Sequence, residues 1–357
     1  MITISLCMIV KDEEDVLARC LDSVSRVADE IIIVDTGSTD KTKEIAGQYT
    51  EKVYDFPWIE DFAAARNFSF SKAEMEYCMW LDADDILLEE DQNKLLQLKE
   101  TLPADIDIVM MQYHTAFDEQ GNPSFFYYRE RIVRNHRGFF WKGAIHEVIM
   151  HTGKTLYSNA AVTHRKLHPS DPDRNLRIFE LQIAQGAQLS PRDLFYYGRE
   201  LYYHKKYQQA AAAFTDLLAE KNAWIENLIE SCRYLAYCYY ALGEEDSALK
   251  SLLQSLAFDL PRAETCCDIA RHFFDRDRIE QAIFWYKTAL TCKRNDQSCG
   301  FISSDCYGYL PCIQLCVCYD KLGRRDLAVE YNEKAGQYKP YAKAYLYNKT
   351  YFEQNPL

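Results

Sequence analysis

Three aspartates form the chemically most suggestive group in this chain of 357 residues. Asp82, Asp84 and Asp85 directly follow the apolar run 77–81, where a buried strand would end. Two carboxylates placed two residues apart at a strand exit can share one hard divalent cation, because such cations prefer oxygen ligands and are commonly held by one or two carboxylates together with substrate phosphates. The pattern therefore indicates a cation site that would neutralise a leaving diphosphate, although single carboxylates after strands also serve as turn formers or helix caps.

Two further polar residues could complete such a site. Arg66 lies in the segment 64–67 and could place a fixed positive charge at the same diphosphate. Asp35 follows the β-branched run 31–34 and could accept hydrogen bonds from a nucleobase or a ribose. Because ligands of open α/β sheets bind beyond the carboxyl ends of the strands, we expect these side chains to lie at one edge of a sheet.

Strand-like and helix-like segments alternate over roughly the first 165 residues. Apolar residues between positions 16 and 24 fall on one helical face, and the Gly, Ser and Thr residues of segment 35–40 suit a turn that leads into a helix. This alternation predicts an α/β domain with a parallel sheet covered on both faces. The expected strands are short apolar runs at residues 2–10, 31–34, 77–81, 107–117, 125–134 and 155–164.

The second half of the chain is helical and repetitive. Four alanines anchor a repeat, with spacings of 38, 34 and 46 residues, and a small residue stands twelve positions before each of them. A helix–turn–helix unit of about 34 residues with small residues at the helix crossings resembles the tetratricopeptide repeat. The period is degenerate, with an insertion around residues 294–305, so an irregular helical bundle is the alternative. The anchors are Ala210, Ala248, Ala282 and Ala328.

The charge and apolar pattern exclude several classes of partner. The net charge is −13, from 41 Lys and Arg against 54 Asp and Glu, so we expect no nucleic acid or anionic membrane surface as partner. No apolar stretch approaches the 18 or so residues of a membrane span. The first ten residues lack a positively charged segment before them, which argues against a signal peptide and favours a cytoplasmic protein.

The 13 cysteines agree with a reducing compartment. Their number is odd, ten of them follow residue 230, and no pair has CxxC spacing. Without an export signal, we interpret them as reduced thiols that pack as small apolar residues. A zinc site built from Cys292, Cys299 and Cys306 is the alternative, although these spacings match no common zinc template.

Four segments together resemble the family-2 glycosyltransferases of the GT-A fold. They are residues 2–14, IIIVDTGSTD (31–40), DFAAARN (61–67) and WLDADD (80–85), in the order and spacing of that family. The segment WKGAIHE (141–147) and the repeats extend the resemblance to members with a tetratricopeptide tail, such as the peptide S/O-glycosyltransferases that modify bacteriocins. We therefore expect a GT-A domain at residues 1–172 and an all-α tetratricopeptide-like domain at residues 173–357.

The resemblance implies a role for each matching residue of the donor site. The backbone after Val10 and the side chain of Asp35 would hold the nucleotide base. Arg66 would lie near the diphosphate. Asp82 would contact the ribose and the metal, and Asp84 would ligate Mn²⁺ or Mg²⁺.

A histidine late in a GT-A domain can complete the metal shell. His164 follows the strand-like segment 159–163 and is the candidate for this role. A packing or surface histidine is the alternative, since neither residue type nor position separates the two.

Glu147 and His146 are the candidates for chemistry on the acceptor side. Displacement at an anomeric carbon needs a carboxylate that takes the proton of the acceptor, and we expect Glu147 to be this base with His146 in an orienting or metal-binding role. The segment 146–151 also reads HExxxH, but this is one residue longer than the HExxH of metalloproteases. Asp118 and Glu119 are earlier acidic candidates, in a segment expected to form a hairpin loop.

These expectations combine into an inverting, metal-dependent glycosyltransferase that uses a nucleotide-sugar, in the first place a UDP-sugar. The acceptor would be a Ser or Cys of a peptide or protein, or a glycan, bound with help from the concave surface of the repeats. The repeats could also join copies of the chain into a homo-oligomer. One alternative is a catalytically inactive scaffold that acts through its repeats. Another is a nucleotidyltransferase, for which the Gly-rich phosphate loop is missing.

Overall fold

The chain forms two compact units, Met1–Ala187 and Gln188–Leu357. The structure, a computed structural model, describes residues 1–117, 121, 123–150, 152–167, 171–295 and 300–355. The expected division at residue 172 and the observed one at residue 187 differ by one helix, α5 (Arg174–Ala184). This helix packs with the first unit, where the guanidinium carbon of Arg174 lies 4.8 Å from the ring centre of Phe62.

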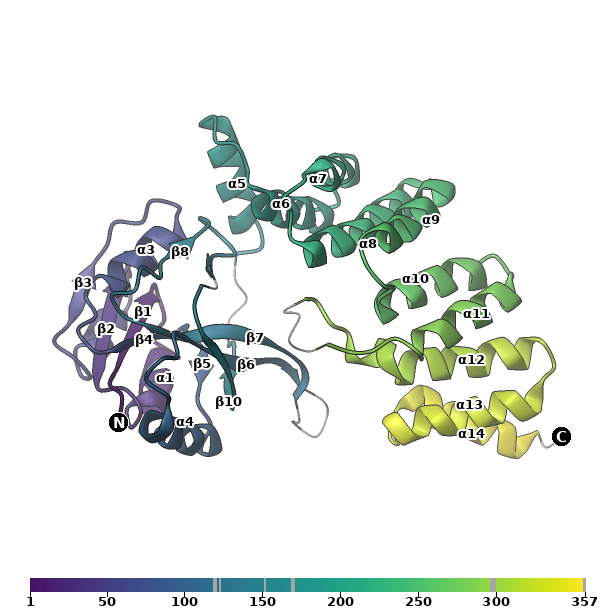
Figure 1. Cartoon of the computed structure of the whole chain (residues 1–357), viewed down its shortest axis with the longest axis horizontal. Coiled ribbons are helices and arrows are strands. Elements are labelled where there is room, and N and C mark those ends of the chain that lie inside the picture. Colours follow the sequence, from purple (N-terminus) through teal and green to yellow (C-terminus); the bar gives the residue numbers. More distant parts are fainter. Residues whose placement is uncertain (118–120, 122, 151, 168–170, 296–299, 356–357) are drawn as a thin grey trace. The chain divides into compact units, whose positions relative to one another are not determined.

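An eight-stranded sheet forms the centre of the first unit, in the order β3-β2-β1-β4-β7-β6-β10-β5 (Figure 1). Strand β1 is parallel to β2 and β4, β2 to β3, and β6 to β10, whereas β7 is antiparallel to both neighbours and β5 to β10. The mostly parallel α/β sheet expected from the sequence is thus confirmed. The strands are β1 (Ile4–Val10), β2 (Glu30–Asp35), β3 (Val53–Asp55), β4 (Tyr77–Trp80), β5 (Asp85–Ile86), β6 (Ile108–Phe117), β7 (Pro123–Arg134) and β10 (Thr155–His164).

Helices cover the sheet and carry the apolar stripe that the sequence predicts. Alternate residues of β1, such as Leu6 and Met8, are fully buried in one core with Leu17 and Leu21 of α1 and Leu95 of α4, because successive strand residues face opposite sides. Helix α3 packs against β1 and β2. The helices are α1 (Leu17–Val24), α2 (Thr42–Ala46), α3 (Phe62–Phe70) and α4 (Glu89–Thr101), and a separate hairpin pairs β8 (Trp141–Lys142) with β9 (Val148–Ile149).

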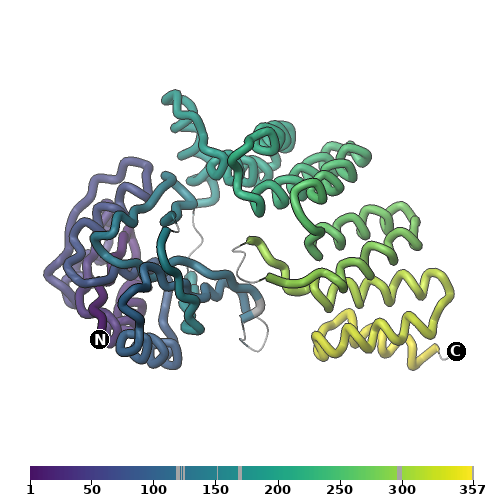
Figure 2. The backbone as a smooth tube through the Cα atoms, viewed as in Figure 1, coloured from purple at the N-terminus to yellow at the C-terminus, as the bar shows by residue number. Residues whose placement is uncertain are grey.

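The second unit is a succession of antiparallel helix pairs, which the tube of Figure 2 follows from one hairpin to the next. All four anchor alanines are fully buried, which confirms the helical repeat. A Cβ added at Gly198 would lie 2.7 Å from the ring of Phe214, so any larger residue at this crossing requires the ring or the helix to shift. The helices are α6 (Pro191–Tyr203), α7 (Tyr207–Ala219), α8 (Ile225–Leu242), α9 (Glu245–Gln254), α10 (Ala263–Phe274), α11 (Ile279–Ala289), α12 (Tyr309–Lys321), α13 (Arg325–Tyr338) and α14 (Lys343–Gln354), with short 3₁₀ turns η1 (Ser255–Ala257) and η3 (Ser304–Tyr307).

In the part of the chain that the structure describes, every helix is too short or too polar to cross a membrane.

Candidate active site

The loops that follow β1 and β2 are joined into one surface. The N–H of Asp12 donates to the hydroxyl of Ser38 at 2.9 Å, and the carboxylate of Asp12 accepts from the N–H of Thr39 at 2.7 Å. Asp12 has a positive φ of 53°, a conformation that Asp tolerates better than most residues. The loops 11–15 and 36–42 therefore hold each other in place at the carboxyl edge of the sheet.

Asp35 lies at this edge of the sheet, and the described residues hydrogen-bond only one of its two carboxylate oxygens. The side chain is 2% exposed, and Oδ1 accepts from the N–H groups of Gly37 and Ser38, both at 3.0 Å. Oδ2 is buried and finds no hydrogen-bond partner among the described residues. A buried acceptor without a donor costs free energy, so this oxygen is suited to an N–H or O–H of a ligand. The carbonyl of Val10 beside it already accepts from the N–H and the hydroxyl of Thr36, at 2.9 and 3.1 Å.

Arg66 joins two acidic residues that lie far apart in the sequence. Its Nε donates to Oε1 of Glu147 at 2.6 Å, and its Nη2 donates to Oδ1 of Asp82 at 2.7 Å. The guanidinium is buried, with the rings of Trp80 and Trp141 each 4.9 Å from its carbon. Its Nη1 is also buried and has no acceptor among the described residues. The Nη1 amino group of this buried cation therefore has hydrogen-bonding capacity that the described residues do not use.

The positive charges of Arg66 and Arg131 keep the Asp82 carboxyl ionised. Burial would raise the pKa of the Asp82 carboxyl, but the positive charges of Arg66 and Arg131 outweigh it and lower the pKa to about 2. Asp82 is therefore an anion throughout the physiological pH range.

Asp84, Asp85 and His164 form the one group in the described residues whose arrangement suits a metal ion. Their ligand atoms all lie within 4.8 Å of one another, and Nδ1 of His164 is 3.4 Å from an oxygen of each carboxylate. Asp85 is fully buried and accepts from Nη1 of Arg131 at 3.1 Å and from the hydroxyl of Tyr113 at 2.9 Å. Two carboxylates and an imidazole fit a divalent cation such as Mn²⁺ or Mg²⁺.

The pKa values around this group reflect its excess of negative charge. Burial raises the pKa of Asp84, and the charges of Asp82 and Asp85 raise it further against the opposing effect of His164. The hydrogen bond to Asp85 raises the pKa of His164, although burial opposes this. A cation bound here would relieve the repulsion, which supports the fit of the group to a metal.

The structure brings most of the sequence-predicted site residues together and separates one from its expected partner. Asp82 lies outside the Asp84–Asp85–His164 group because its carboxylate is bonded to Arg66 instead. Glu147 follows the half-buried His146, whose φ of 50° places the chain in a tight turn between β8 and β9. The turn directs Glu147 to Arg66.

The sequence also offered a metalloprotease-like HExxxH segment, two earlier acidic candidates and a cysteine zinc site. Residues 146–150 form a turn and a short strand, so the described part of the HExxxH segment has no helix that could bring two histidines together. Asp118, Glu119 and Cys299 lie outside the described residues. Among the described residues, neither Cys292 nor Cys306 belongs to a group of three metal-ligating side chains.

Sequence reasoning missed the arginines of β7. Arg129 and Arg131 lie on β7, which pairs with β4. Their guanidinium carbons are 4.8 and 3.8 Å from the ring centre of Trp80 in β4. Arg131 is completely buried. The charged stretch 129–131 lies in the middle of an expected strand. Because charges are almost never buried unless they are paired, this stretch could have indicated a buried ion pair.

The family comparison agrees with this geometry. Residues 5–162 match the model of glycosyl transferase family 2. The first unit contains a family-2 glycosyltransferase domain. Asp35, Arg66, Asp82, Asp84 and Glu147 all lie in the matched part of the chain.

Two curated relatives extend the likeness of this glycosyltransferase domain and of the repeats. The prophage-derived glycosyltransferase SunS of Bacillus subtilis is 28% identical over 227 residues, which covers 58% of this chain and 51% of SunS. A TPR repeat-containing protein of Synechococcus elongatus is 44% identical over 95 residues, which covers 27% of this chain and 24% of that protein. The chain thus spans about half the length, or less, of these relatives.

Two solved structures are similar to parts of the chain, with low TM-scores. MamA is 22% identical with a TM-score of 0.35, covering 44% of this chain and 83% of that one. The glucosyl-3-phosphoglycerate synthase of Mycobacterium tuberculosis, in complex with Mg²⁺ and UDP, is 23% identical with a TM-score of 0.28, covering 31% of this chain and 44% of that one.

Proposed function

We propose that the chain is an inverting, metal-dependent glycosyltransferase that transfers a sugar from a UDP-sugar to a peptide, protein or glycan acceptor. The observation that carries the proposal is the contact network of the family-2 domain. In this network Arg66 bonds to both Asp82 and Glu147. Asp82 stands two residues before Asp84, which belongs to the metal-ligand group with Asp85 and His164. The likeness to the glycosyltransferase SunS supports the choice of transfer chemistry.

The donor nucleotide would bind at the carboxyl ends of β1 and β2. Oδ2 of Asp35 is a buried acceptor for which the described residues offer no donor, and the imide N–H of uracil is a donor of matching type. Nη1 of Arg66 is the group suited to an oxygen of the diphosphate, because Nε and Nη2 are already bonded to carboxylates. A charge-assisted hydrogen bond in a buried position would orient the leaving group.

Asp84 and His164 would hold the cation together with Asp85, whereas Asp82 is bonded to Arg66. When bound, the cation supplies the positive charge that stabilises the leaving diphosphate. Tyr113 would orient Asp85 and His164, since its hydroxyl lies 2.9 Å from both the Asp85 carboxylate and Nδ1 of His164.

We propose Glu147 as the base. Its side chain is 13% exposed and its Oε1 accepts from Nε of Arg66. In this proposal Oε2 takes the proton of an acceptor hydroxyl or thiol. As the acceptor atom bonds to the anomeric carbon, its proton passes to Glu147 and the bond from that carbon to the diphosphate oxygen breaks on the opposite face. The configuration at the anomeric carbon is inverted. The repeats would bind the acceptor chain, and they could also join two copies of the protein.

The decisive experiment replaces Glu147 with Gln, which keeps the size but cannot take a proton. We expect UDP affinity in the presence of Mn²⁺ to stay within a few-fold of the wild type and single-turnover transfer to fall by about 10²–10⁴, the usual contribution of a general base. The exposed Glu51→Gln is the matched control. A large loss of UDP affinity would indicate that Glu147 positions Arg66 and is not the base. An unchanged transfer rate would show that another residue is the base.

The donor is identified by a second assay. A panel of nucleotide sugars is offered with Mn²⁺ and without acceptor, and the released nucleotide is measured. Slow hydrolysis of one UDP-sugar would name the donor. Absence of both UDP binding and hydrolysis would favour the inactive scaffold.

A further inference from the structure

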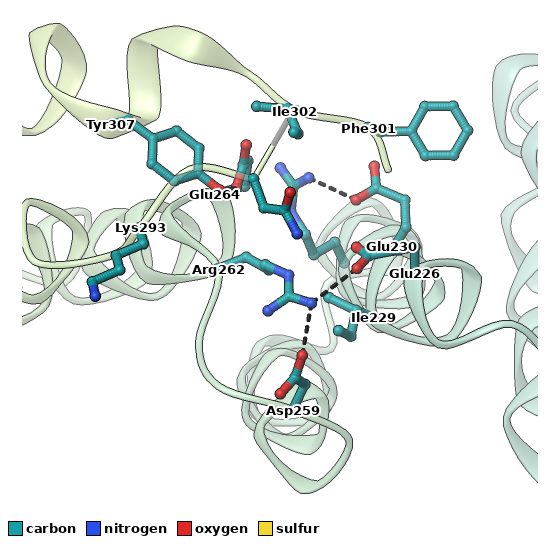
Figure 3. A pocket seen from close by; sticks show the side chains of 12 residues that line it. Glu226, Ile229, Glu230, Asp259, Arg262, Glu264, Lys293, Phe301, Ile302 and Tyr307 are labelled. Carbon is teal, nitrogen blue, oxygen red and sulfur yellow. Dashed lines mark hydrogen bonds and ion pairs between the residues drawn. The ribbon is translucent and has the colours of Figure 1, made fainter. Parts of the chain in front are cut away.

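The second unit contains a cavity of about 140 Å³ that is lined by α8, α10 and the segment between α11 and α12 (Figure 3). Two ion pairs join the helices beside it. Nε of Arg233 in α8 lies 2.7 Å from the carboxylate of Asp268 in α10. Nη2 of Arg262, directly before α10, lies 2.9 Å from the carboxylate of Glu226 in α8. These pairs fix the spacing of the two helices, so the cavity is part of the packed repeat structure.

Most of the acidic side chains of this cavity are paired with arginine. The described residues contribute four carboxylates to its lining. Those of Glu226 and Asp259 lie 2.9 and 2.8 Å from Nη2 of Arg262. That of Glu230 lies 2.8 Å from Nη1 of Arg233. The fourth carboxylate forms no ion pair with a described residue, which makes it the candidate to receive a cation from outside the chain.

The fourth carboxylate belongs to Glu264, which lies in the first turn of α10 and is 4% exposed. One oxygen accepts from the N–H of Ser303 at 2.7 Å, and the other accepts from the hydroxyl of Tyr307 at 3.1 Å. Burial raises the pKa of the Glu264 carboxyl, against these hydrogen bonds and the charge of Arg233, which lower it. Because a buried charge without a counter-charge is costly, a cation beside this carboxylate would stabilise its ionised form.

The other side of the cavity is suited to an alkyl chain. Ile229, Ile302 and the ring of Tyr307 line it beside the charged groups. Lysine and arginine side chains combine an apolar stem, which packs on such surfaces, with a cationic head that donates hydrogen bonds. Lys293 of the chain itself is exposed, and Figure 3 shows its ammonium group directed away from Glu264. The lining therefore matches a cationic side chain that comes from a ligand.

We propose that this cavity binds the side chain of a lysine or arginine of the acceptor polypeptide, with the carboxylate of Glu264 as the counter-charge. Tyr307 and the backbone of Ser303 position that carboxylate. The proposal rests on the proposed function only in naming the polypeptide as the acceptor. An apolar side chain in the same place would leave the carboxylate unpaired, and an acidic one would be repelled, so the cavity would select among acceptor sequences.

The test titrates the full chain with Nα-acetyl-lysine N-methylamide and with its arginine counterpart, followed by ligand-observed NMR. We expect saturable binding of at least one of these probes. The norleucine counterpart has an alkyl side chain without the charge and should bind at least about tenfold more weakly, because a hydrogen bond to a charged group is lost. Absence of saturable binding by both cationic probes, or equal binding of the norleucine probe, would overturn the proposal.

Substitutions assign the binding to the cavity. Glu264→Gln keeps the size of the side chain and an acceptor for Ser303, and it should weaken binding of the cationic probe at least about tenfold. The exposed Glu220→Gln is the matched control and should change nothing. Tyr307→Phe keeps every charge and should weaken binding only a few-fold. Wild-type affinity in Glu264→Gln would show that the probe binds elsewhere and that the assignment is wrong.

The proposed function is tested separately on the same preparation. The probe titration contains no donor and no metal, so its outcome does not depend on sugar transfer. UDP affinity in the presence of Mn²⁺ reports on the first unit. UDP binding without binding of either cationic probe would therefore refute the cation site and leave the proposed transfer chemistry intact. Binding of a cationic probe that is lost in Glu264→Gln would support the cation site whatever the affinity for UDP.

Discussion

The two units of the chain bury different kinds of side chain. The first unit encloses charges beside its candidate active site, where Arg131 and Asp85 are both completely buried and Arg66 nearly so. The second unit encloses alanines, thiols and glycines at helix crossings, as at Gly198. The second unit also buries Glu200 and Glu264, at 8% and 4% exposure. A site for a charged ligand requires, in addition, buried charges that are paired with each other and keep some hydrogen-bonding capacity for the ligand.

The largest effect on stability should follow from breaking a buried pair of the first unit. Arg131→Met leaves the charge of Asp85 buried without its ion-pair partner, which typically costs about 3–5 kcal/mol. The matched pair of the second unit joins Arg271 to Asp275, with side chains 68% and 48% exposed, and Arg271→Met should cost less than about 0.5 kcal/mol. Hydrogen exchange of the sheet and helix amides would measure both losses, and equal costs would abolish the contrast between the units.

The largest effect on activity should come from the metal-ligand group. Asp84→Asn keeps the shape of the side chain but removes a ligand charge. We expect turnover to fall by at least about 10²-fold, or about 2.7 kcal/mol of transition-state stabilisation, and EDTA to have the same effect on the wild type. Release of UDP from the donor is the measurement, with the exposed Asp246→Asn of the second unit as control. Activity that survives EDTA would refute metal dependence.

A smaller loss of stability should follow in the second unit when a helix crossing is filled. Gly198→Ala would place a methyl group against the buried ring of Phe214, and overpacking of this kind typically costs about 1–3 kcal/mol. In the first unit, a Cβ at Gly47 meets only ordinary contacts of 3.5 Å or more, at a φ of −63°. Gly47→Ala should therefore be neutral or stabilising by up to about 1 kcal/mol. Urea denaturation of both variants measures their free energies of unfolding. An unchanged free energy for Gly198→Ala would show that the helix crossing has room for a methyl group.

The smallest effect concerns acid. The pKa of Asp82 is about 2 in the folded chain, below its ordinary value of 3.8. A lowered pKa adds stability that is present above the ordinary value and is lost as the pH falls through the folded value. Because the Asp82 side chain is 37% exposed, we expect only about 1 kcal/mol from it. The stability difference between wild type and Asp82→Asn should shrink between about pH 5 and about pH 2.5, and a constant difference would contradict the ion pair with Arg66.

The part of the candidate site that lies at strand ends could be predicted from the sequence. Asp35 follows the β-branched run 31–34, and Asp82 and Asp84 follow the apolar run 77–81, so their place at the sheet edge was expected from the local pattern. The link from Arg66 to Glu147 was not predictable, because it depends on how α3 packs against the hairpin of β8 and β9. The roles of Arg131 and Tyr113 depend on the register of the antiparallel strands β6 and β7, which only long-range pairing sets.

The separation of Asp82 from the metal-ligand group has a local cause. In a continuing strand, residues 82 and 84 would point to the same side. Strand β4 ends at Trp80 and the chain turns at residues 83–84, so the two carboxylates point to different partners. The sequence pattern predicts the carboxylates but not the turn between them.

The interlocked loops 11–15 and 36–42 have a consequence for any attempt to exchange one of them with the loop of another transferase. The N–H of Glu13 donates to the hydroxyl of Thr42 at 2.7 Å, and the N–H of Glu14 donates to the carboxylate of Asp40 at 3.1 Å. An exchange in one loop leaves donors in the other without acceptors, so substitutions in the two segments should covary among related sequences. A graft from another transferase would succeed when both loops are transplanted as one cassette, and would fail when either is moved alone.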